Sequence, residues 1–181
     1  MILREATRQR HEEAENHRFV KALFGGNLPF KAYAEFLYNQ MFAYRALELA
    51  AKEAGVLEGI SEIQRTKKIK EDLTALGELD PNLYPLKLHK STHDYIQYVL
   101  GLQQADDLMA HVYVRHMGDM FGGAMIKKVI AGPGHMYEFE NRGALIQEIR
   151  SRLKSEMADE ANRVFEFAIR LFEEIANEHD L

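Results

Sequence analysis

The chain has 181 residues, a length that suits a single domain, residues 1–181, with its own hydrophobic core. With 46% hydrophobic and 28% charged residues it is typical of a globular protein in water, and the net charge of -5 argues against a nucleic-acid partner. The absence of cysteine excludes disulfides, iron–sulfur clusters and thiolate-bound metals. We find no signal peptide and no apolar run of about 20 residues, so we expect a cytoplasmic protein without a membrane partner.

Helical periodicity runs through almost the whole sequence, and no segment shows the alternation of a strand. We expect a first helix over about residues 3–16 and a continuation over residues 17–24, which a glycine pair then ends because glycine suits a left-handed C-terminal cap. A long helix is expected from Pro29 to Gly55, since proline is favoured in a first helical turn. The predicted fold class is therefore all-α.

Further helices are expected after residue 60. Ser61 opens the pattern of a capping box, which predicts that the next helix begins there. The basic run at residues 65–70 is expected to be a solvated face of that helix. A long connection with two prolines is expected over residues 77–90. The remaining helices are expected over residues 92–102, residues 105–131 and about the last 20 residues.

Three glycines, Gly118, Gly122 and Gly123, lie inside the helix expected over residues 105–131. Each glycine inside a helix costs about 1 kcal/mol relative to alanine, so a cluster of three needs a physical reason. One reason is the close approach of a second helix, and the other is a large flat ligand lying against the main chain. The residues alone leave both interpretations open.

A polar strip accompanies these glycines. His111, Arg115 and Asp119 are spaced i, i+4 and i+8, so they share one side of the helix beside Gly118 and Gly122. Arg115 and Asp119 also fit an ordinary surface ion pair, so this strip by itself does not decide between a structural and a functional role.

A second polar stripe lies on the expected N-terminal helix. Arg4, Arg8, His11 and Glu15 are spaced i, i+4, i+7 and i+11, within a sector of roughly 60°. A surface helix can carry such a stripe by chance. The order of the groups nevertheless suits a planar metal complex with acid groups at its edge: guanidinium groups bind carboxylates, an imidazole binds a metal, and the carboxylate beyond it orients the imidazole.

Two of these segments resemble a known family. Leu3–Asn16 is similar to the opening of haem (heme) oxygenases, and His111–Lys128 resembles their glycine-containing distal helix. The stretches Phe30–Glu48, Tyr137–Phe139 and Glu160–Glu174 are also similar, so the resemblance covers nearly the whole chain and looks closest to soluble, ferredoxin-dependent enzymes of cyanobacteria and their viruses. It implies a multi-helix fold with haem between a proximal N-terminal helix and a kinked, glycine-rich distal helix.

The resemblance also implies roles for single residues. His11 is implied as the axial ligand of the haem iron and Glu15 as its partner, while Gly118 and Gly122 lie over the distal face and Asp119 holds a water network. Tyr44 and Arg115 are implied to belong to that network. Contacts with haem, including its propionates, are implied for Arg4, Arg8, Tyr113, Gly123, Arg150 and Phe165.

The implied activity is that of a haem oxygenase. Haem b is then both substrate and cofactor and is opened at the alpha-meso carbon to biliverdin IX-alpha, carbon monoxide and ferrous iron, with dioxygen and electrons from a reduced ferredoxin-type donor. The product is expected to feed bilin pigment synthesis, with a bilin reductase as a downstream partner. The sequence departs from the family pattern at Phe121, His116, Ile146 and Ala168, where serine, tyrosine, a basic residue and asparagine are usual, which puts the propionate contacts and the regiochemistry in question.

The alternatives to a haem oxygenase are a haem carrier or sensor, a di-iron oxidase and a helical interaction module. A haem carrier or sensor without turnover needs the same His11 and arginines and differs only in what Asp119 does. A di-iron oxidase needs Glu-x-x-His pairs, and no acidic residue stands three positions before any of the eight histidines. A helical interaction module predicts no haem affinity.

Overall fold

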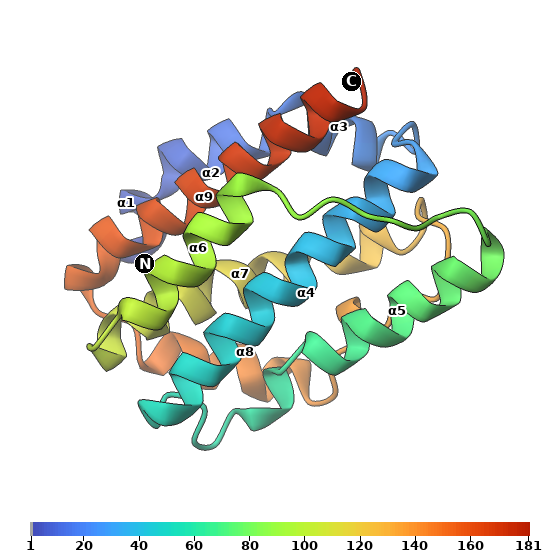
Figure 1. Cartoon of the computed structure of the whole chain (residues 1–181). Helices are drawn as coiled ribbons and strands as arrows, with labels where there is room; N and C mark the ends of the chain where they lie inside the picture. The colour runs from blue at the N-terminus through green and yellow to red at the C-terminus, as the bar shows by residue number, and fades with distance from the viewer. Residues whose placement is uncertain (1) are drawn as a thin grey trace.

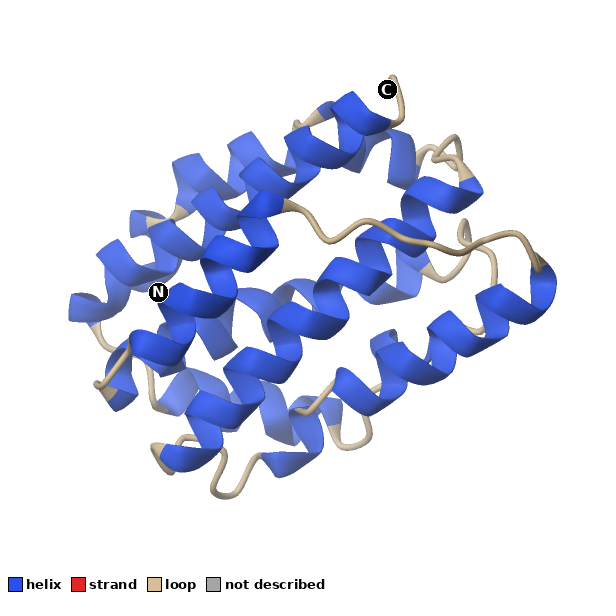
Figure 2. Ribbon diagram, in the orientation of Figure 1, coloured by secondary structure: helices blue, strands red, loops and turns tan. Residues whose placement is uncertain are grey.

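The computed structural model describes residues 2–181, and every regular element in that range is a helix (Figures 1 and 2). This confirms the predicted all-α class. The α-helices are α1 (Ile2–Ala6), α2 (Arg8–Glu15), α3 (Arg18–Phe24), α4 (Phe30–Glu53), α5 (Thr66–Leu79), α6 (Lys90–Gly101), α7 (Ala105–Ile126), α8 (Arg142–Ser151) and α9 (Ala158–Glu178), and short 3-10 turns occupy Ser61–Ile63, His135–Tyr137 and Ser155–Met157.

The long helix α4 packs against α5, α6, α7 and α9. In Figure 1 it crosses the middle of the view, with α6 on one side and α5 on the other. Its buried residues lie around much of its circumference, as expected for a helix enclosed by others. The C-terminal helix α9 is the second organising element, because α2, α3, α6 and α7 all pack on it.

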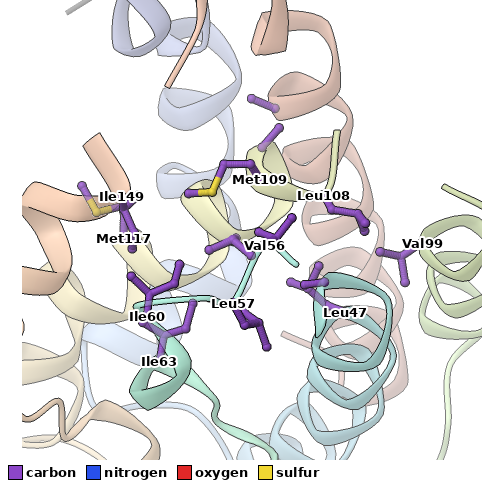
Figure 3. Packing of buried hydrophobic residues seen from close by; sticks show 14 of the residues in the cluster. Leu47, Val56, Leu57, Ile60, Ile63, Val99, Leu108, Met109, Met117 and Ile149 are labelled. Atoms are coloured by element: carbon purple, nitrogen blue, oxygen red, sulfur yellow. The ribbon is translucent and has the colours of Figure 1, made fainter. Parts of the chain in front are cut away.

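Two apolar clusters hold these helices together. The first contains Leu47 of α4, Val99 of α6, Leu108 of α7 and Ile149 of α8 (Figure 3). The second gathers side chains of α3, α4, α5 and α9, among them Leu37 of α4. Burial of large aliphatic and aromatic side chains contributes about 1.5–3 kcal/mol each, so these clusters supply most of the driving force for packing.

Several predicted boundaries differ from the structure. The expected N-terminal helix is divided at Thr7, whose hydroxyl donates to the Leu3 carbonyl at 3.0 Å, and again at residues 16–17. The glycine-containing helix ends at Ile126 and not near residue 131. The helix α8 was not expected at all. Its ten residues are too short for the apolar period to stand out, and its burial depends on the surrounding helices.

The capping box predicted at Ser61 is wrong. Residues 61–63 form a 3-10 turn, and α5 begins only at Thr66. The carboxylate of Glu48, from α4, accepts hydrogen bonds from the backbone N–H groups of Arg65 and Thr66 and from the Thr66 hydroxyl. A side chain distant in sequence therefore satisfies the first N–H groups of α5, which local sequence patterns cannot reveal.

Candidate functional site

The predicted proximal and distal helices, α2 and α7, both pack against α9. On α2, the His11 side chain is 52% exposed, and its Nδ1 lies 3.5 Å from Oε2 of Glu15. The imidazole ring meets Phe165 of α9 edge-on, with 5.7 Å between ring centroids. A carboxylate beside Nδ1 favours the tautomer in which Nε2 carries a lone pair, which is the nitrogen that a metal binds.

The three glycines of α7 have different surroundings. A Cβ atom on Gly123 would lie 2.7 Å from Cβ of Tyr137, so close packing within the protein explains this glycine. A Cβ on Gly122 would make only ordinary contacts with Phe24 and Ile126, and a Cβ on Gly118 would meet nothing within 4 Å. Packing against Tyr137 therefore explains why residue 123 is a glycine and leaves Gly118 unexplained, while the contact of Gly123 with haem stays a prediction.

Alanine substitutions should separate these two kinds of glycine. We expect Gly123→Ala to lower the free energy of unfolding by about 1–3 kcal/mol, because Tyr137 must shift. Gly118→Ala should raise it by about 0.5–1 kcal/mol in the ligand-free chain, since alanine favours the helix and nothing obstructs its methyl group. Urea denaturation of both variants measures the difference, and equal destabilisation would show that Gly118 is also a packing residue.

An apolar strip surrounds the open backbone. Gly118, Phe121, Gly122 and Met125 are spaced i, i+3, i+4 and i+7 and so share one face of α7. Phe121 is 53% exposed and Met125 is 60% exposed, and Phe24 of α3 lies beside Gly122. Exposed apolar groups next to bare backbone are suited to a flat, largely apolar ligand.

Asp119 lies on α7 next to Gly118. The Tyr44 hydroxyl of α4 donates a hydrogen bond to its Oδ2. Burial raises the pKa of Asp119 to about 6, against the hydrogen bond from Tyr44 and the positive charges of Arg115 and Arg65, which lower it. A carboxyl group with a pKa near neutrality can both accept and release a proton under physiological conditions.

Arg115 is held by a chain of hydrogen bonds whose direction is determined. Nε2 of His111 faces the Glu160 carboxylate, which can only accept, and burial lowers the pKa of His111, so the neutral ring carries its proton on Nε2 and its Nδ1 accepts from the Tyr95 hydroxyl at 2.9 Å. The same hydroxyl accepts from Nε of Arg115 at 2.9 Å. Nε2 of His111 then donates to Oε1 of Glu160 at 2.8 Å. His111 is therefore a buried, neutral orienting residue, in agreement with burial lowering its pKa. Gln40 accepts from the second arm of Arg115 at 2.9 Å.

A heme oxygenase family model matches residues 1–174 of the chain. The chain belongs to the haem oxygenase family. This confirms the resemblance read from Leu3–Asn16 and His111–Lys128.

Related proteins support the same assignment. The chain is 30% identical to a heme oxygenase of Pyropia yezoensis over 200 residues, covering 96% of this chain and 84% of that protein. It is 32% identical to heme oxygenase 2 of Synechocystis over 207 residues, covering 99% and 81%. A heme oxygenase of Porphyra purpurea is 33% identical over 137 residues, which cover 72% of this chain and 58% of that protein.

Solved structures show that the helices are arranged as in this family. Heme oxygenase from Leptospira interrogans superposes with a TM-score of 0.82 at 29% identity, covering 96% of this chain and 97% of that one. Synechocystis heme oxygenase-2, solved with heme and NO, gives 0.82 at 27% identity, covering 97% and 84%. Synechocystis heme oxygenase-1, solved with heme, gives 0.84 at 24% identity, covering 97% and 91%, which supports the fold.

The residues that depart from the haem oxygenase pattern have distinct environments. Phe121 is exposed on the apolar strip of α7, and Ile146 is 9% exposed and packs in the first apolar cluster. His116 is 1% exposed, and its Nδ1 lies 2.9 Å from the Val112 carbonyl oxygen. Burial lowers the pKa of His116 to about 3, so this imidazole stays neutral in the interior.

The predicted cationic residues do not all behave alike. Burial raises the pKa of Tyr113, while the positive charges of Arg4 and Arg150 oppose that rise. Arg8 is a surface residue. Its side chain is 78% exposed, and its Nε lies 3.7 Å from Oε1 of Glu12.

One cation near the site was not anticipated. Arg65 belongs to the basic run expected to be a solvated face, but it is only 3% exposed. Its guanidinium donates to the carbonyls of Glu62, Ile63 and Glu138 and lies 3.9 Å from the centroid of the Phe139 ring. Its charge helps to lower the pKa of Asp119, so a buried cation outside the predicted set acts on the site.

No helix within residues 2–181 combines the length and apolar character needed to cross a membrane.

Proposed function

We propose that this chain binds haem b between α2 and α7 and oxidises it at the alpha-meso carbon to biliverdin IX-alpha, carbon monoxide and ferrous iron, using dioxygen and electrons from a reduced ferredoxin-type donor. The open space at Gly118, beside an exposed apolar strip and Asp119, is the observation that carries the proposal. Bound haem supplies redox-active iron and is itself the molecule that is opened. The electrons for this oxidation are proposed to come from that external donor.

His11 holds the ligand in this proposal. Its exposed imidazole offers Nε2 to the iron, while Glu15 keeps the proton on Nδ1. Phe165, which meets the ring edge-on, limits its rotation. A neutral histidine donates less electron density than a thiolate, which suits oxidation of the porphyrin carbon rather than early cleavage of the O–O bond.

Asp119 is proposed to exchange protons on the other side of the haem. Its raised pKa suits this task, and the Tyr44 hydroxyl holds its carboxylate in place. Arg115 cannot relay protons from His111, because the hydrogen bonds of that chain run away from the arginine. We therefore assign Arg115 a positioning and electrostatic role, and protons reach Asp119 from water on the haem side.

The backbone at Gly118 and Gly122 is proposed to set which carbon is oxidised. Without side chains there, the porphyrin lies against α7 itself, and the helix limits where a reacting oxygen fits. Arg4, Arg8 and Arg150 are proposed to hold the propionates, with Tyr113 beside them, and so fix the rotation of the ring.

The proposal is tested with purified protein, haem and a ferredoxin reducing system. We expect a coloured one-to-one complex and its conversion to a green bilin, followed by absorption and identified by chromatography. A control without reductant should keep its haem. Tight binding with intact haem after reduction would indicate a carrier or sensor, and no binding would indicate a helical interaction module. A bilin reductase is proposed to consume the product.

A further inference from the structure

Glu160 of α9 is the common end of two hydrogen-bond chains. Its Oε1 accepts from Nε2 of His111 at 2.8 Å, and its Oε2 accepts from the Tyr98 hydroxyl at 2.9 Å. The Tyr98 hydroxyl in turn accepts from Nη1 of Arg163, a half-exposed side chain, at 2.6 Å. The chain through His111 leads to Arg115 beside the proposed haem site. One carboxylate therefore joins groups of α6, α7 and α9.

The Glu160 carboxylate is ionised and can only accept. Its side chain is 12% exposed. Burial opposes ionisation, yet the hydrogen bonds from His111 and Tyr98 and the charge of Arg163 hold the pKa of Glu160 below its usual range. An ionised carboxylate has no hydrogen to give, so both of its partners must donate. Because burial lowers the pKa of His111, the proton that Nε2 gives to this bond is the only one on the ring.

Aromatic packing leaves the direction of one O–H bond as the remaining freedom in the chain to Arg115. The Phe167 ring of α9 lies edge-on to the Tyr95 ring, with 5.3 Å between centroids, and Tyr95 is 1% exposed. The Tyr95 O–H bond points to the bare Nδ1 of His111, which leaves lone pairs on the oxygen for Nε of Arg115. A proton on Nδ1 would take up a second lone pair and leave the buried Tyr95 hydrogen without this acceptor, which costs free energy.

We propose that Glu160 is a positioning residue for Arg115, and that it acts by fixing which nitrogen of His111 carries the proton. This inference deepens the proposed function, in which Arg115 lies next to Asp119 in the site. The chain holds the Arg115 guanidinium 4.1 Å from the centroid of the Tyr95 ring. Held there, its positive charge opposes the burial that raises the pKa of Asp119. A carboxylate of α9 thereby affects the proton affinity of a carboxylate of α7.

The first test measures the His111 tautomer in the unmodified, ligand-free chain. Long-range proton–nitrogen NMR spectra distinguish a protonated imidazole nitrogen from a bare one, and the His111 signals are identified by their loss in His111→Asn. Near neutral pH we expect a proton on Nε2 and none on Nδ1. This measurement needs neither haem nor a Glu160 variant. A proton on Nδ1 in the unmodified chain overturns the inference while the proposed function stands.

The second test removes the acceptor with Glu160→Met. We expect averaged His111 signals from both tautomers, together with hydrogen exchange at Nε–H of Arg115 about fivefold faster, the range of one lost hydrogen bond. Tyr98→Phe is the matched control, because it removes the other donor to the same carboxylate. It should leave the His111 signals and the Arg115 exchange rate unchanged. Circular dichroism melts show whether both variants fold.

A third measurement follows the effect to Asp119 by carbon-13 NMR titration of its carboxyl group. Tyr44, Arg115 and Arg65 are the groups that act on this carboxyl, and only the position of Arg115 should change in Glu160→Met. We expect a higher titration midpoint for Asp119 in that variant and the unmodified midpoint in Tyr98→Phe. A folded Glu160→Met chain with a single His111 tautomer and an unchanged midpoint overturns the inference. A chain that neither binds nor opens haem refutes the proposed function instead, and these spectra still decide the role of Glu160.

Discussion

His11→Ala is expected to abolish the iron–nitrogen stretching band that resonance Raman spectroscopy detects in the haem complex of the unmodified chain. His11 is the half-exposed imidazole of α2, placed beside Glu15 and against Phe165. Its removal leaves the iron without a protein ligand on that side. Added imidazole should restore a band by filling the space left by the side chain.

Two further variants make this result specific. His93→Ala removes another exposed histidine, on α6, and should leave the band unchanged. Glu15→Gln keeps the ligand and removes the charge beside Nδ1, so the band should shift and haem affinity should fall roughly 10-fold. Identical bands in the unmodified chain and His11→Ala would refute the assignment of His11 and with it the proposed orientation of the haem.

Asp119→Ala is expected to slow biliverdin formation by about 100-fold, since a positioned acid or base contributes roughly that much or more to a proton transfer. The carboxylate is the polar group of α7 next to the open glycine backbone, and the Tyr44 hydroxyl orients it. Absorption time courses with a fixed reducing system measure the rate. Tyr44→Phe retains the carboxylate and should cause a smaller loss, so a normal rate in Asp119→Ala would contradict the proposed role.

The raised pKa of Asp119 gives this assignment a second, independent readout. Burial raises the pKa from 3.8 to about 6, so the folded chain binds this proton more tightly than the unfolded chain does. Ionisation of Asp119 therefore lowers the free energy of unfolding as pH rises from about 4 to about 6, and this free energy stays lowered at higher pH.

The side chain in Asp119→Asn cannot ionise, so the free energy of unfolding of this variant should not fall over that pH range. We expect it to be about 1–3 kcal/mol more stable than the unmodified chain at pH 7.5 and to show no such advantage at pH 3.5. Urea denaturation at the two pH values measures the difference. An advantage of the same size at both pH values would show that the pKa of Asp119 is not raised in the folded chain.

The long helices were predictable because their apolar residues repeat over several turns. The helix expected from Pro29 to Gly55 is α4, and the expected C-terminal helix is α9. The start of α5 was predicted wrongly, at Ser61 in place of Thr66, and α8 was not predicted at all. Glu48 caps α5 from another helix, and α8 is a short helix defined mainly by what it packs against.

The candidate site shows the same division. His11, Asp119 and the glycines stood out because their residue types at helical spacing are unusual in a helix that serves packing alone. Tyr95 and Glu160 gave no comparable signal. Each is an ordinary helical residue whose role comes from the hydrogen bond it makes to Arg115 or His111 in another helix.

The sequence by itself determined three things: the chain is all-α, a histidine and a carboxylate lie one turn apart near its start, and one long helix contains a cluster of glycines. These follow from helical periodicity and residue type, which are local properties. Only the tertiary structure decided that Tyr137 fills the space at Gly123 while Gly118 stays open, and that Arg65 is buried. The physical reason is that a helical period determines which face a residue occupies, whereas the group that meets that face is set by packing between segments far apart in the chain.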